Sequence, residues 1–161
     1  DDNYIENTCA ASPLHDIGKV GIPDSILLKP GKLTVEEFSD MKTHTSIGAE
    51  TLREVNRLHS GNDFVRIGIE IAESHHEKWD GTGYPYGLSG ENIPLVGRIL
   101  ALPDVYDALT SSRCYKEAFS HDRSFEIIKD GRGKHFAPDV VDAFVYAEKD
   151  FVRIREHYLD T

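Results

Sequence analysis

Apolar residues recur every three to four positions through most of this chain, and short polar segments rich in Gly and Pro separate the apolar stretches. This spacing is typical of helices that turn one face to a core, whereas the strict alternation of a half-buried strand is almost absent. We therefore predict an all-α protein, a single helical bundle around one core. The expected helices cover residues 3–17, 34–42, 45–58, 64–76, 96–111 and 124–129, with a last helix from Pro138 onward.

Local signals set the expected helix boundaries. Gly18 is expected to end the first helix, and Thr34 is expected to cap the second because acidic residues follow it in the first turn. Pro138 should begin the last helix, since proline is favoured in a first turn. The glycine-rich residues 80–90 should form a loop.

The length, charge and cysteine content of the chain exclude some classes of protein and favour others. The 161 residues fit one domain, residues 1–161, and the net charge of −10 argues against bulk binding to nucleic acid or to an anionic membrane. No apolar run approaches the roughly 20 residues needed to span a bilayer. Cys9 and Cys114 lie far apart, which favours a reducing compartment and a cytoplasmic location.

Four separated segments offer imidazole or carboxylate groups within apolar helical sequence. Each alone has an ordinary explanation, such as a core histidine or a helix cap, but burying so many unpaired polar groups would cost several kcal/mol each. Metal ions explain the whole set. Oxygen and imidazole donors without thiolate favour Fe, Mn, Co, Ni or Zn at a hydrolytic site. The candidate ligands are His15, Asp16, His44, His75, His76 and Asp104.

Three basic residues accompany these segments. Lys19 follows Asp16 by about one helical turn, so it forms either an ion pair or a cation for a bound phosphate. Arg113 and Lys116 stand one turn apart at the end of a helix. They are either a solvated pair of cations that interacts favourably with the C-terminal end of the helix dipole, or a pair that binds phosphate.

Taken together, the motifs resemble the HD-GYP family of metal-dependent phosphodiesterases, within the HD superfamily. They are His-Asp-Ile-Gly-Lys at 15–19, Lys-Thr-His at 42–44, His-His-Glu-Lys-Trp-Asp-Gly-Thr-Gly-Tyr-Pro at 75–85, and Asp-Ala-Leu-Thr-Ser-Ser-Arg-Cys-Tyr-Lys at 107–116. The resemblance implies an all-helical fold with two or three divalent metal ions, most often iron or manganese. It also implies hydrolysis of cyclic di-GMP to pGpG or GMP by a hydroxide that bridges two metals, with some members preferring cyclic GMP-AMP.

The resemblance also implies residue roles. The six candidate ligands would hold the metals, with Asp16 bridging them, and Lys19 would contact the scissile phosphate or the leaving oxygen. Arg113 and Lys116 would hold the dinucleotide phosphates. Tyr84 would border the substrate cleft, in a loop that is also linked to partner proteins.

The family carries a further histidine ligand before the His-Asp motif, and no residue before His15 supplies it. We therefore expect the chain to be a piece that lacks its first helices and that follows a sensory or receiver domain in the parent protein. Two alternatives stay open. One is a cyclic-dinucleotide-binding or partner-recruiting module with weak or no catalysis, and the other is a nucleotidase that acts on mononucleotides. Metal analysis and a turnover assay on cyclic di-GMP separate the three.

Overall fold

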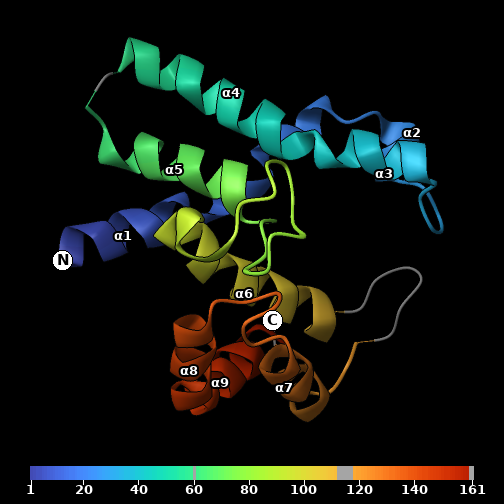
Figure 1. Cartoon of the computed structure of the whole chain (residues 1–161), viewed down its shortest axis with the longest axis vertical. Helices are drawn as coiled ribbons and strands as arrows, with labels where there is room; N and C mark the ends of the chain where they lie inside the picture. The colour runs from blue at the N-terminus through green and yellow to red at the C-terminus, as the bar shows by residue number, and fades with distance from the viewer. Residues whose placement is uncertain (60, 112–117, 160–161) are drawn as a thin grey trace.

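The computed structural model describes residues 1–59, 61–111 and 118–159, and within them the protein is all-α, as predicted (Figure 1). No strand forms in this part of the chain, which contains only isolated bridges between Asp80 and Ser89 and between Arg132 and Phe136. No described helix is long and apolar enough to cross a membrane. The elements are α1 (Asp2–Ala11), η1 (Ser12–Gly21), α2 (Asp24–Leu27), α3 (Val35–Lys42), α4 (His44–Leu58), α5 (Asp63–Ser74), η2 (Gly90–Asn92), α6 (Leu95–Thr110), α7 (His121–Asp130), α8 (Pro138–Tyr146) and α9 (Glu148–Leu159).

Helix α6 connects two of the hydrophobic clusters around which the helices pack, and a further cluster lies between α4 and α5. Helices α4 and α5 run side by side in opposite directions, with α1 and η1 packed against α5, while α7, α8 and α9 gather at the far end of α6 (Figure 1). One cluster joins α1, α5 and α6 and includes Ile71 and Val96. The other joins α6 to α7 and α8 and includes Leu102 and Phe144. Because α6 contributes to both clusters, its position is fixed from two sides.

The N-terminal segment differs from the predicted single helix over residues 3–17. Helix α1 ends at Ala11, and Ser12–Gly21 forms a 3₁₀ helix with proline in its first turn. Gly18 does not end a helix, because it is buried inside η1 against the start of α4. A Cβ atom at Gly18 would lie 1.9 Å from the carbonyl oxygen of His44, so only glycine permits this approach.

Several other boundaries follow their local signals. Thr34 and Glu37 form the reciprocal capping box at the start of α3, and Pro138 begins α8. Two boundaries were predicted wrongly. Helix α7 begins at His121 because Ser120 caps it, and the last predicted helix breaks at Ala147 into α8 and α9.

Candidate metal centre

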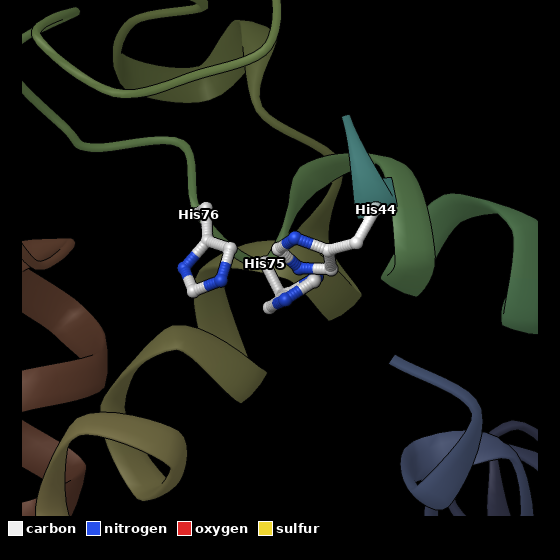
Figure 2. A group of neighbouring side chains, drawn as sticks. All are labelled: His44, His75 and His76. Atoms are coloured by element: carbon white, nitrogen blue, oxygen red, sulfur yellow. The ribbon is translucent and has the colours of Figure 1, made fainter. Parts of the chain in front are cut away.

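The predicted ligands come together at one end of the α4–α5 pair, although they belong to four separate elements. His15 and Asp16 lie on η1, His44 begins α4, His75 and His76 follow the last turn of α5, and Asp104 lies on α6. Figure 2 shows the rings of His44, His75 and His76 gathered in one group. One nitrogen from each of these three rings lies within 4.8 Å of the others. This spacing suits donors that share a metal ion.

Hydrogen bonds to the backbone orient three of the imidazole rings. The Nδ1 atoms of His15, His44 and His75 lie 2.8, 2.7 and 3.0 Å from the carbonyl oxygens of Ser12, Met41 and Ile71. A carbonyl oxygen can only accept, so each of these Nδ1 atoms carries a hydrogen. The neutral rings of His44 and His75 therefore keep a free lone pair on Nε2. His15 differs, because its Nε2 donates to Asp16, and this hydrogen bond raises the pKa of His15. The Nε2 atoms of His44 and His75 are buried and lack a hydrogen-bond partner. Metal-binding histidines are oriented by the same second hydrogen bond.

Asp16 lies between two of these histidines. Its Oδ2 atom is 3.2 Å from His15 Nε2 and 2.5 Å from Lys19 Nζ, and its Oδ1 atom is 3.5 Å from His44 Nε2. Lys19 falls on the same face as Asp16 because residues three apart eclipse in a 3₁₀ helix. Burial opposes ionisation of Asp16, but the hydrogen bonds from His15 and Lys19 outweigh it and hold its pKa well below the usual range. The carboxylate is therefore charged, and its buried Oδ1 atom has no hydrogen-bond partner.

Burial keeps the clustered histidines neutral. Desolvation, aided by nearby His15, lowers the pKa of His75 to about 4. Desolvation and the neighbouring His75 lower the pKa of His76 to about 2, and burial also lowers the pKa of His44. Neutral imidazoles beside an ionised carboxylate form a donor set for a divalent metal ion. The unpartnered Nε2 and Oδ1 atoms fit such an ion, which would satisfy them.

Asp104 and Tyr84 border the same centre. Asp104 Oδ1 lies 3.9 Å from His15 Nε2, so it stands at the edge of the histidine group. The Tyr84 ring lies 4.7 Å from the ring of His76, measured between centroids. Burial, followed by the charges of Asp104 and Asp16, raises the pKa of Tyr84, so its hydroxyl keeps its proton. Both residues line a cleft of about 400 Å³ that opens beside the histidines.

Comparison with known proteins identifies the family of this centre. The family model of the HD domain matches residues 1–140. The chain belongs to the HD domain family. Within the family, its His-Asp and Gly-Tyr-Pro motifs place it in the HD-GYP branch, as predicted.

Curated relatives align with most of the length of this chain. A cyclic di-GMP phosphodiesterase of Vibrio cholerae is 59% identical over 157 residues, which are 98% of this chain and 32% of the relative. A cyclic di-GMP phosphodiesterase response regulator of Xanthomonas campestris is 52% identical over 84% of this chain and 34% of its own length. A 3′3′-cGAMP-specific phosphodiesterase of Vibrio cholerae is 45% identical over 90% of this chain and 27% of its own length. The chain thus spans about a quarter to a third of the length of these relatives.

Sequence reasoning did not single out three residues of this region, Glu77, Lys78 and His135. Glu77 is 2% exposed, and its carboxylate accepts hydrogen bonds from the backbone N–H groups of Tyr86 (2.7 Å) and Leu88 (3.0 Å). Glu77 therefore anchors the part of the loop that follows Tyr84. The signal was present in the motif, as an acid directly after the paired histidines, but the sequence does not reveal its burial.

Arg113 and Lys116 lie outside the described residues, so their roles stay predictions.

We expect Glu77→Gln to loosen this loop. A glutamine amide offers one carbonyl oxygen, so one of the two backbone N–H groups would face an NH₂ group instead of an acceptor. Leaving one buried donor unsatisfied should lower the free energy of unfolding by about 1–3 kcal/mol. Urea denaturation measures this loss. Glu91→Gln, at an exposed acid of η2, is the control and should leave stability unchanged. Equal stability of the two variants would contradict the anchoring role of Glu77.

Proposed function

We propose that this HD domain is a metal-dependent phosphodiesterase that hydrolyses cyclic di-GMP to pGpG, GMP or both. The carrying observation is the pair of buried Nε2 atoms of His44 and His75, which lack a hydrogen-bond partner. The Nε2 atom of His44 lies 3.5 Å from Asp16 Oδ1, and His75 and Asp16 both line the cleft. The names of the relatives point to the substrate class. One of them acts on 3′3′-cGAMP, so the proposal includes cyclic GMP-AMP as a second substrate to be compared.

The proposed ligand set comprises His15, Asp16, His44, His75, His76 and Asp104, with Asp16 bridging two or three ions of iron or manganese. Such ions, when bound, supply Lewis-acid activation of water and of the phosphoryl oxygens. Lys19 has a partly exposed ammonium 2.5 Å from Asp16 Oδ2. It would offset the negative charge that develops as the P–O bond to the leaving oxygen breaks. Tyr84 would donate a hydrogen bond from its protonated hydroxyl at the edge of the cleft. Arg113 and Lys116 would hold the dinucleotide phosphates.

The proposal extends to the protein's surroundings. The response-regulator relative supports an upstream receiver domain that would control the HD domain. Tyr86 in the Gly-Tyr-Pro loop is 59% exposed, which supports this loop as a contact for a partner protein. Cys9 is a free, exposed thiol, which fits the reducing conditions of the cytoplasm.

Turnover of cyclic di-GMP in the presence of Mn(II) or Fe(II) tests the activity. We expect linear product from the metal-loaded protein, none after chelation, and recovery when metal is restored. The reason is that the proposed reaction depends on the metal to activate the attacking water and to polarise the phosphoryl oxygens. Product is followed by chromatography. His75→Ala should abolish it, whereas His59→Ala, at an exposed histidine at the end of α4, should not.

Two results would contradict the proposal. Binding of cyclic di-GMP without turnover at full metal loading would favour the binding module. Hydrolysis of mononucleotides with no action on cyclic dinucleotides would favour the nucleotidase.

A further inference from the structure

One part of the cleft lining carries two basic residues for which the proposed mechanism has no use, Lys78 and His135. Backbone hydrogen bonds bring their two segments together: Trp79 N–H donates to the carbonyl oxygen of His135 (3.1 Å), and Asp80 N–H donates to that of Lys134 (2.9 Å). In Figure 1 the orange segment after α7 reaches the yellow-green loop after α5 at this place. Lys78 and His135 therefore both line the cleft, although 56 residues separate the two backbone segments that pair, at 79 and 135.

The positive charge of Lys78 is available to a ligand. Lys19, the other lysine of the cleft, is held by Asp16 at 2.5 Å. The two carboxylates nearest in sequence to Lys78 have other partners. Glu77 accepts from the backbone N–H groups of Tyr86 and Leu88, at 2.7 and 3.0 Å. Asp80 accepts from the N–H and the hydroxyl of Thr82, at 2.9 and 2.7 Å. Across the described ranges, no carboxylate lies within 4 Å of the Lys78 ammonium. A half-buried cation without an ion pair, in a protein of net charge −10, fits an anionic ligand.

His135 supplies a hydrogen-bond donor beside this cation. Its ring stacks on Phe136, with 4.3 Å between centroids and 4° between planes, so its orientation is fixed. Within the described residues, neither of its ring nitrogens has a hydrogen-bond partner. Burial and the charge of Lys78 lower the pKa of His135, so the ring is neutral near pH 7 and carries one N–H.

The other residues that line the cleft indicate what kind of molecule carries the anionic group near Lys78. Val105, Ala108 and Leu109 of α6 give the cleft an apolar face, and the metal-ligand candidates Asp16, His75 and His76 form another part of it. A ligand that fits would combine flat apolar surface, one phosphate at the histidines and a second anionic group near Lys78. A cyclic dinucleotide has this composition, because it carries two nucleobases and two phosphates.

We propose that Lys78 and His135 bind the second, non-scissile phosphate of the cyclic dinucleotide, in addition to the phosphate contacts proposed above for Arg113 and Lys116. Lys78 contributes the charge and His135 an N–H hydrogen bond, and together they hold the substrate so that its other phosphate lies at the histidine group. This inference rests on the proposed function. It assigns to the cleft wall a role in substrate selection and none in bond cleavage.

Two substrates separate this role from the chemistry. Cyclic di-GMP has the second phosphate, whereas bis(p-nitrophenyl) phosphate is a diester with a single one. Lys78→Met removes the charge and keeps the chain length, and it should raise the KM for cyclic di-GMP about tenfold, the typical value of a charge-assisted hydrogen bond. The kcat/KM for bis(p-nitrophenyl) phosphate and the metal content should stay within about twofold of wild type, since the variant leaves the proposed ligands intact. His135→Phe keeps the stacking and loses the N–H, and should raise the KM for cyclic di-GMP about threefold to tenfold.

Lys134→Ala is the matched control. Lys134 is exposed, precedes His135 in the chain and does not line the cleft. The variant removes one lysine charge, as Lys78→Met does, and should leave the kinetic constants for both substrates unchanged. Lys78→Arg should restore most of the affinity for cyclic di-GMP. An unchanged KM in Lys78→Met, an equal loss on both substrates, or an equal effect of Lys134→Ala would each overturn the inference.

Direct titration with cyclic di-GMP distinguishes failure of this inference from failure of the proposed function. If the wild-type protein binds the dinucleotide but does not cleave it, the proposed activity is wrong, and the Lys78→Met dissociation constant still tests the second phosphate site. If the wild type cleaves it and Lys78→Met behaves like wild type, only the phosphate site is wrong. A wild-type protein that neither binds nor cleaves the dinucleotide overturns both.

Discussion

Asp16→Asn should remove both the bound metal and the activity. The substitution keeps the size of the side chain, but an amide cannot supply two anionic oxygens between His15 and His44. Changing a residue that only supports a ligand already costs about 10–100-fold in metal affinity or activity, so losing the carboxylate proposed to bridge the metals should lower kcat/KM by more than about 100-fold. Elemental analysis of metal per chain and a turnover assay on cyclic di-GMP measure the two effects.

Asp107→Asn is the control on α6. Asp107 is exposed, and its carboxylate accepts a hydrogen bond from the Ser111 hydroxyl at 3.2 Å, outside the histidine group. This variant should keep its metal and its activity. Wild-type metal content in Asp16→Asn would show that Asp16 is not a bridging ligand.

Gly18→Ala should strongly destabilise the fold and disturb the metal centre. The added Cβ atom would lie 1.9 Å from the carbonyl oxygen of His44 and 2.5 Å from the backbone nitrogen of Gly48. Backbone atoms cannot rotate away, so η1 and α4 must separate, and we expect a loss of about 3 kcal/mol or more in the free energy of unfolding. The separation also moves Asp16 away from His44. Chemical denaturation and metal titration should therefore change together.

Gly21→Ala tests whether the effect depends on this contact. Its added Cβ atom would meet only the side chain of Ile47, at 3.1 Å, and a side chain can shift by a few tenths of an ångström. We expect a loss below about 1 kcal/mol and unchanged metal binding. Similar losses in the two variants would contradict the role of the close approach between Gly18 and the His44 carbonyl, because the helix propensity of alanine alone would stabilise both variants.

The helices were largely predictable because their signals are local. The capping box of Thr34 and the proline at the start of α8 depend on residues a few positions apart, and both appear where expected. The break after Ala11 was missed because the apolar spacing continues through it. Only the contact between Gly18 and the His44 carbonyl, 26 residues later in the chain, shows why η1 must run close to α4.

The candidate site was predictable as a set of residues but not as an arrangement. The motifs nominate His44, His75 and His76, and the structure places their ring nitrogens within 4.8 Å. The motifs do not reveal that Nδ1 of His44 is bonded to the Met41 carbonyl, because that depends on the ring orientation after folding. A shared role of Lys78 and His135 was not predicted for a related reason. The two residues lie far apart in sequence, and only the backbone hydrogen bonds in the folded chain bring their segments together.

Helix α6 has a consequence for cooperativity. It buries Val96 in the cluster with α1 and α5 and Leu102 in the cluster formed with α7 and α8, and it carries Asp104 two residues after Leu102. A cation held by Asp104 and the histidines would bind the native state and not the unfolded chain, and its binding free energy would add to the stability of that state. Because one helix belongs to both clusters, this added stability should reach the C-terminal helices, which contribute none of the proposed ligands. The two halves should therefore melt in a single transition whose midpoint rises with metal concentration.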